Sequence, residues 1–155
     1  MALAAHIRIQ AEDFDIAAEI QRLAAGRTDI GAIVTFSGLC RDEDGALLAL
    51  ELEHYAGMAE AEIARIVEEA QARWPLGGVC VIHRFGRISP GENIVLVATV
   101  SRHRAAAFEA ASFLMDYLKS KAPFWKKEHR TDGQSGNWVD AKESDDLAAA
   151  KWRKP

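Results

Sequence analysis

The sequence lacks the short motifs that mark several large classes of protein. Its two cysteines, Cys40 and Cys80, do not form a C-x-x-C pair, and its five histidines are scattered without an H-x-x-x-H spacing. No zinc, redox or other metal motif is therefore visible. The G-x-S-x-G, Walker and G-x-G-x-x-G motifs are also absent, so nothing favours a hydrolase or a nucleotide-binding fold. We predict that both cysteines are small buried thiols.

The sequence also has no apolar run long enough to cross a membrane, and its amino terminus lacks the apolar stretch of a secretory signal. The net charge of -4 argues against general binding of nucleic acid or of anionic membranes, because both need a basic face. We therefore expect a protein of the reducing cytoplasm in which any anion site is a local cluster of cations.

The 155 residues suffice for one domain, and a hydrophobic fraction of 49% is ordinary for a globular protein. Apolar patterns predict strands at 6–10, 32–38, 48–54, 79–85, 94–101 and 125–130, and helices at 16–24, 63–74 and about 104–119. Turn residues predict a hairpin across 42–45 and a second one between 125–130 and 137–139.

Strands that occur both in hairpins and between helices favour an α+β domain over a doubly wound parallel sheet. We predict mixed or antiparallel sheets packed against about three helices, in a single domain spanning 1–155. The charged, alanine-rich segment 142–155 is predicted to be a short helix or a mobile end of that domain.

The segment 115–128, MDYLKSKAPFWKKE, places Lys119 and Lys126 on either side of an apolar corner. Phe108, Met115 and Lys119 fall on one stripe of the predicted helix, so we expect Lys119 at the carboxyl end of its apolar face. Desolvation disfavours the charged form of lysine, and such a corner tends to hold a reactive amine or an anion site. The alternative is a cation that merely complements the helix dipole.

A second candidate anion site is Ser101-Arg-His-Arg104, at the predicted junction of a strand and a helix. Free N–H groups at a helix start attract anions. The alternative is a serine cap with solvated arginines. Arg41, just beyond the 32–38 strand, is by itself an exposed turn residue, and His83, inside an apolar strand, is predicted to be a core histidine.

Taken together, several stretches resemble the catalytic (large) subunit family of molybdopterin synthase. They are VTFSGLCRD, LELEHYAGM, RWPLGGVCVIHRFG, SRHRAAAFEA and MDYLKSKAPFWKKE, within about Ile30 to Trp152. The resemblance implies an α/β-hammerhead type of fold and an enzyme of molybdenum cofactor biosynthesis. That enzyme transfers sulfur onto a cyclic pyranopterin monophosphate to make molybdopterin, and uses no metal or organic cofactor itself.

The resemblance also implies partners. The sulfur donor is the C-terminal thiocarboxylate of a small ubiquitin-like carrier subunit that ends in Gly-Gly. Two large subunits form a central homodimer with one carrier at each end, a heterotetramer.

Carried over by position, the family's catalytic lysines fall on Lys119 and Lys126. The substrate and phosphate contacts fall on Leu39, Cys40, Arg41, His103, Arg104, Lys126, Lys127 and Glu128, some of them from the neighbouring subunit. We assign Lys119 the acid/base or covalent role, and Lys126 the positioning of substrate or carrier tail. Leu39 stands where some relatives carry a basic residue. Lys142 stands where some carry arginine, and lysine lacks bidentate phosphate recognition.

Two functions from other classes also fit these residues. One is a non-catalytic binding module for a phosphorylated metabolite, in which the lysines serve only as anion contacts. The other is a Schiff-base lysine enzyme acting on a carbonyl substrate. Co-purification of a carrier ending in Gly-Gly favours the synthase over the first, and borohydride trapping identifies the second.

Overall fold

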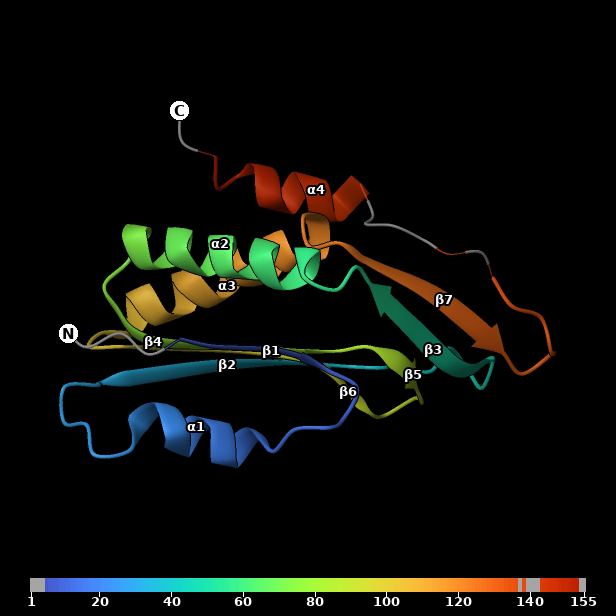
Figure 1. Ribbon diagram of the computed structural model, residues 1–155, viewed down its shortest axis with the longest axis horizontal. Helices are drawn as coiled ribbons and strands as arrows, with labels where there is room; N and C mark the ends of the chain where they lie inside the picture. The colour runs from blue at the N-terminus through green and yellow to red at the C-terminus, as the bar shows by residue number, and fades with distance from the viewer. Residues whose placement is uncertain (1–4, 137, 139–142, 154–155) are drawn as a thin grey trace.

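The computed structural model describes residues 5–136, 138 and 143–153. These residues form a single α+β domain with two sheets and four helices, which confirms the predicted fold class (Figure 1). The elements in chain order are β1 Ala5–Gln10, α1 Ile16–Ala24, β2 Ala32–Leu39, β3 Leu47–His54, α2 Met58–Arg73, β4 Leu76–Arg84, β5 Gly86–Ile88, β6 Asn93–Ser101, α3 Arg104–Ser120, β7 Phe124–Arg130 and α4 Glu143–Ala150.

The first sheet, of order β1-β4-β6-β2, separates two layers of helices. α1 covers one face, α2 and α3 cover the other, and α4 lies over α3 (Figure 1). Both faces of β4 and β6 are covered, so these central strands are buried almost throughout. Val79 and Val81 of β4 belong to the larger core under α2 and α3, whereas Cys80 and Ile82 belong to the smaller core under α1.

The second sheet, of order β5-β3-β7, lies at one end of the first sheet (Figure 1). β3 does not pair with β2, so the predicted hairpin across 42–45 is wrong. After β2, the Cys40 N–H donates to the Glu92 carbonyl at 2.8 Å and the Gly91 N–H donates to the Cys40 carbonyl at 2.6 Å. These bonds direct the chain away from the first sheet, and apolar residues of β3 and β5 are then buried against Cys40.

The second predicted hairpin is found in part. β7 pairs with β3, and His129 of β7 forms an isolated bridge with Ser135. Residues 137 and 139, the predicted ends of the returning strand, lie outside the described residues, as does Lys142.

The sequence predicted either a short helix or a mobile end for the C-terminal segment, and the described part of it forms the helix α4. α4 contacts α3, and Ala149 is buried. The Trp152 Nε1–H donates to the Asp116 Oδ2 at 2.6 Å, and the Trp152 ring packs edge-on against Trp74 and Phe113. The described part of this segment is thus fixed to the helix that carries Lys119.

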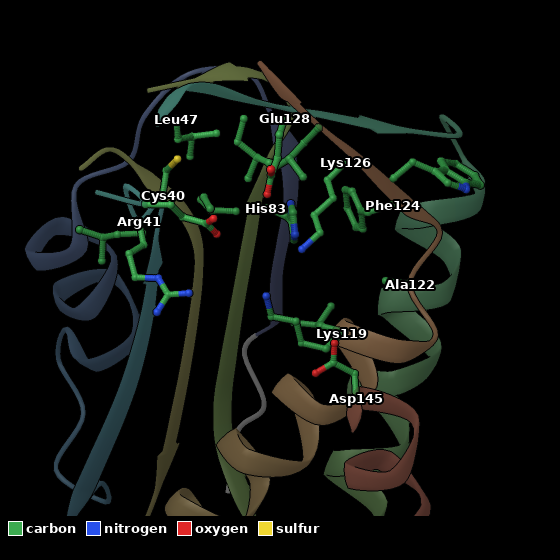
Figure 2. A pocket seen from close by; sticks show the side chains of 17 residues that line it. Cys40, Arg41, Leu47, His83, Lys119, Ala122, Phe124, Lys126, Glu128 and Asp145 are labelled. Atoms are coloured by element: carbon green, nitrogen blue, oxygen red, sulfur yellow. The ribbon is translucent and has the colours of Figure 1, made fainter. Parts of the chain in front are cut away.

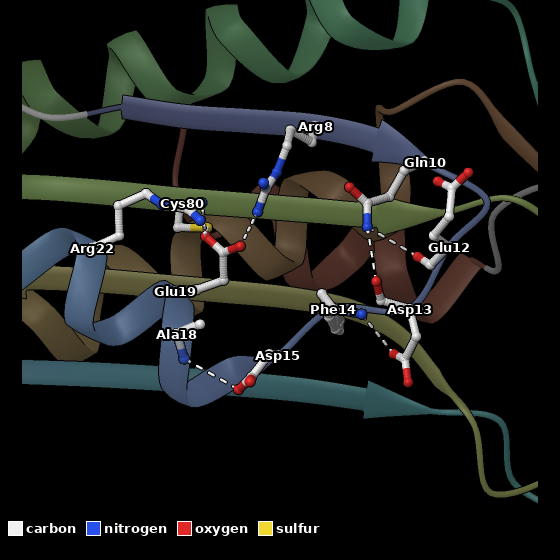
Figure 3. Close-up of polar contacts among 10 residues, drawn as sticks. All are labelled: Arg8, Gln10, Glu12, Asp13, Phe14, Asp15, Ala18, Glu19, Arg22 and Cys80. Carbon is white, nitrogen blue, oxygen red and sulfur yellow. Dashed lines mark hydrogen bonds and ion pairs between the residues drawn. The ribbon is translucent and has the colours of Figure 1, made fainter.

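A carboxylate is buried beneath α1. Glu19, 5% exposed, forms ion pairs with Arg8 of β1 and with Arg22, whose Nη1 lies 2.9 Å from its Oε2 (Figure 3). The Cys80 Sγ lies 3.8 Å from the same oxygen. Glu19 therefore joins α1 to β1 and β4. Burial, together with this carboxylate, raises the pKa of the Cys80 thiol to about 12, so the thiol is protonated and unreactive.

Candidate active site

A cavity of about 310 Å³ lies at the junction of the two sheets (Figure 2). The segment after β2, the strands β3, β4 and β7, the end of α3 and the start of α4 form its wall. Its charged lining residues are the cations Arg41, Lys119 and Lys126 and the carboxylates Glu43, Glu128 and Asp145. With equal numbers of both signs, the lining suits a ligand that carries an anionic group and also hydrogen-bond donors.

Lys119 lies on this wall in the last turn of α3. The buried residues of that helix are Ala107, Ala110, Ala111, Phe113, Leu114 and Leu118. Phe108 is 60% exposed, Met115 is half-buried and Lys119 is exposed. The stripe through these three residues lies beside the buried face, about 100° around the helix, so the prediction that it is the apolar face is wrong. The small alanines of the buried face allow α3 to lie close to the first sheet.

β7 brings a second lysine to the cavity. Lys126 is half-buried and lies opposite Leu52 of β3. Side chains alternate along a strand, so Glu128 lines the cavity with Lys126, whereas Lys127 does not. The Lys127 ammonium instead lies 5.6 Å from the centre of the Trp138 ring.

The segment after β2 forms another part of the wall. Cys40 is 3% exposed, and burial raises the pKa of its thiol, which makes the thiol a poor nucleophile. Arg41 is exposed and lines the cavity beside Leu39, which offers no charge. Buried Cys40 and Cys80 confirm the prediction of small buried thiols.

His103 and Arg104 lie at the other end of α3 and do not line the cavity. At about 1.5 Å per residue, Arg104 is about 22 Å along the helix from Lys119. His103 is the N-cap and makes no side-chain capping bond, while the Ser101 hydroxyl donates to the Pro75 carbonyl at 2.7 Å. Ser101 is therefore not the helix cap, and this chain does not bring the two predicted anion sites together.

Three titratable lining residues, Glu43, His83 and Asp145, are missing from the sequence-based prediction of the site. His83 is packed against the Phe124 ring and hydrogen-bonded to the Arg84 carbonyl, as predicted for a core histidine, and it also lines the cavity. Strand alternation assigns its face, but only the packing of α3 and β7 reveals that this face ends in a cavity. Asp145 comes from α4, and nothing in a charged, alanine-rich segment indicates where such a helix docks.

Comparison with known proteins identifies the family. The family model described as MoaE protein matches residues 9–121. The molybdopterin synthase catalytic subunit of Mesorhizobium japonicum is 70% identical over 151 residues, which cover 97% of this chain and 95% of the relative. The chain belongs to the MoaE family of molybdopterin synthase catalytic subunits.

Solved structures of MoaE relatives share the fold. The molybdopterin biosynthesis MoaE protein from Burkholderia ambifaria MC40-6 is 49% identical, with a TM-score of 0.82, over 96% of this chain and 97% of that one. A structure from Helicobacter pylori 26695, described as a complex of subunits 1 and 2 of molybdopterin-converting factor, is 21% identical with a TM-score of 0.70 over 90% of each chain.

Two further observations concern the described residues. Among them, no group of three or more His, Cys, Asp or Glu residues is arranged to hold a metal ion. No helix in this part of the chain has the length and apolar character needed to span a membrane.

Proposed function

We propose that this MoaE chain transfers sulfur onto a cyclic pyranopterin monophosphate to form the dithiolene of molybdopterin. The main support is the single cavity that Arg41, Lys119 and Lys126 line from three separate segments. Cations of this kind bind phosphate, and the carboxylates beside them accept hydrogen bonds from the N–H groups of a pterin. The volume of about 310 Å³ lies within the range of small-molecule sites.

The lining residues that the sequence predicted have the following roles in this proposal. Lys119 moves protons or forms a transient covalent adduct, and Lys126 positions the substrate or the carrier tail. Arg41 binds the phosphate, and Leu39 and Cys40 line the cavity wall beside it. Glu128 contacts the substrate from β7, and Lys127, on the other face of that strand, acts indirectly.

The sulfur donor is the C-terminal thiocarboxylate of a small ubiquitin-like carrier that ends in Gly-Gly. Its sulfur attacks a side-chain carbon of the pterin, the carbon–oxygen bond at that carbon breaks, and Lys119 protonates the departing oxygen. Water then cleaves the acyl–sulfur bond, which leaves the sulfur on the pterin and releases the carrier as a carboxylate. A second thiocarboxylated carrier repeats the transfer at the neighbouring carbon. The two-subunit complex described for the Helicobacter pylori relative supports such a partner. A tail in the cavity also covers the exposed Lys119 and removes it from water.

A second copy of the chain supplies His103 and Arg104 in this proposal. β2 is an edge strand of the first sheet, and an open edge with apolar side chains favours pairing with another strand. Its exposed apolar residues are Ile33, Phe36 and Leu39. Antiparallel pairing of two such edges about a twofold axis brings the start of one β2, next to His103, towards the end of the other, next to Arg41. With two carriers, this homodimer becomes a heterotetramer.

The location of the protein is part of the same proposal. Both cysteines are free thiols. Free thiols are usual in the reducing cytoplasm, which we propose as the compartment of this enzyme.

An assay with thiocarboxylated carrier and the cyclic pterin substrate tests the proposed reaction. Lys119→Ala should lower product formation about 100-fold or more, the usual contribution of a positioned acid or base. Lys121→Ala is the matched control, because Lys121 is exposed and does not line the cavity. Near-normal product formation by Lys119→Ala would refute the assignment. Borohydride trapping of wild-type protein then distinguishes a covalent role from proton transfer.

A further inference from the structure

His83 lies where the first sheet meets the cavity. It is the penultimate residue of β4. Its side chain points to the same face of the sheet as those of Val79 and Val81, which belong to the core under α2 and α3. Its ring lines the cavity (Figure 2). The proposed function so far gives this residue no part.

The His83 ring is held in one orientation. Its centre is 3.8 Å from that of the Phe124 ring, and the two planes differ by 16°. Its Nδ1 lies 2.8 Å from the carbonyl oxygen of Arg84. Arg84 is fixed in turn, because its guanidinium donates to the carbonyls of Ala11 at 3.0 Å and Asn93 at 2.8 Å. Stacking on one face and a hydrogen bond at one edge leave the ring little freedom to turn.

The Arg84 carbonyl determines which nitrogen carries the hydrogen. A carbonyl oxygen only accepts, so Nδ1 is the donor. Burial lowers the pKa of His83 to about 4 although this hydrogen bond favours the charged form, and the ring is neutral at neutral pH. A neutral ring with its hydrogen on Nδ1 has a lone pair on Nε2. His83 therefore offers an acceptor that carries no negative charge.

Lys119 and His83 line the same cavity, where Figure 2 shows the Lys119 side chain reaching from the end of α3. After burial, its ammonium is a further cause of the lowered pKa of His83, followed by His54 of β3. Arg41 and Lys126 line the same cavity, and its carboxylates include Glu128 and Asp145. A carboxylate would pair with the ammonium and hold it as an ion. A neutral imidazole orients the same group without forming an ion pair.

We propose that His83 is a positioning residue of the sulfur-transfer site, whose Nε2 accepts a hydrogen bond from the Lys119 ammonium and aims that group at the substrate. This rests on the proposed role of Lys119. The lysine side chain is long and flexible, and a fixed acceptor restricts it to conformations that reach the reacting atoms. Because Arg41 binds the phosphate, loss of the acceptor should affect turnover rather than substrate binding.

NMR of protein carrying ¹⁵N-labelled histidine tests this geometry without turnover. We expect His83 to be neutral, with its hydrogen on Nδ1 and a bare Nε2. The Nε2 resonance should move in Lys119→Ala and should stay in place in Lys121→Ala, whose side chain is exposed and outside the cavity. A hydrogen on Nε2, or an Nε2 resonance unaffected by Lys119→Ala, would overturn the proposal.

Kinetics of two His83 variants test the consequence. His83→Phe keeps a ring to stack on Phe124 but removes the acceptor, whereas His83→Gln retains an acceptor oxygen. Loss of a hydrogen bond to a charged group corresponds to about 10- to 100-fold in rate. The kcat of His83→Phe should fall by about that factor with KM nearly unchanged, and His83→Gln should recover most of the loss.

Other kinetic outcomes have equally definite meanings. An equal loss in both variants, a loss confined to KM, or a wild-type kcat in His83→Phe would overturn the positioning role. Wild-type activity of Lys119→Ala would instead refute the proposed function of Lys119, so the two failures are distinguishable.

Discussion

Replacement of Glu19 by glutamine should lower the free energy of unfolding by about 2 kcal/mol. The Glu19 side chain is 6% exposed and binds Arg8 and Arg22. Removal of one partner from a fully buried ion pair costs about 3–5 kcal/mol. Here the Arg8 and Arg22 side chains are 40% and 46% exposed, so water can solvate them after the change. This reduces the loss towards the roughly 1.5–3 kcal/mol of a hydrogen bond to a charged group.

Urea unfolding at a fixed protein concentration measures this loss. With a slope of about 2 kcal/mol per molar urea, a loss of 2 kcal/mol moves the midpoint down by about 1 M. The corresponding fall in Tm is about 4–8 °C for a protein of this size. The slope itself should not change, because the variant keeps the fold. Concentration is held constant because a dimer gains stability by mass action.

Glu62→Gln is the matched control. Glu62 pairs with Arg65 at the same spacing of three residues, with 2.6 Å between Oε1 and Nη2, but these side chains are 29% and 54% exposed. We expect a loss below about 0.5 kcal/mol, as for other exposed helix pairs. Equal losses in the two variants, or less than about 0.5 kcal/mol for Glu19→Gln, would refute the reasoning from burial.

Two other predictions concern pH and assembly. Folding lowers the pKa of His83 from 6.5 to about 4, so the unfolded chain binds more protons between these values. The His83 contribution to the free energy of unfolding should therefore be complete above pH 6.5 and should fall by about 3 kcal/mol towards pH 4. Urea titrations of wild type and His83→Gln should diverge over this window, and parallel curves would contradict the burial of a neutral ring. Phe36→Glu should convert the proposed dimer to a monomer in sedimentation equilibrium, whereas Leu48→Glu, also exposed but on β3, should not. An unchanged mass for Phe36→Glu would exclude the β2 edge as the interface.

Local signals in the sequence were sufficient to predict most of the individual helices and strands. α1 occupies 16–24 as predicted, because Asp15 caps its first turn and Gly26, with a φ of +69°, follows its end. The partners of the strands were harder to predict. β3 pairs with β7 from the other end of the chain, and this pairing depends on the burial of apolar residues of β3 and β5 against Cys40. No turn motif carries that information.

Some residues of the candidate site could likewise be predicted from the sequence, and others could not. The resemblance brought together Arg41, Lys119 and Lys126, which the structure finds around one cavity. The helix-stripe argument selected Lys119 although its stripe is not the buried face of α3, since the core packs on the alanine side. His103 lies outside the site of its own chain because α3 separates it from Lys119, and this became clear only from the length of the helix in the structure. The proposed role of His83 depends on the Arg84 carbonyl of β4 and the Phe124 ring of β7, and no periodicity in the sequence reveals the contact with that ring.

A defined heterodimer tests the central claim, a catalytic cavity around Lys119 that the partner subunit completes. One copy carries Lys119→Ala and the other Arg104→Ala, with different affinity tags so that only the mixed dimer is purified. If each site combines Lys119 of one subunit with Arg104 of the partner subunit, one of the two sites is intact and the other carries both changes. The mixed dimer should then form product at about half of the wild-type rate, whereas each variant homodimer should be nearly inactive. A mixed dimer no more active than the two homodimers would contradict the central claim.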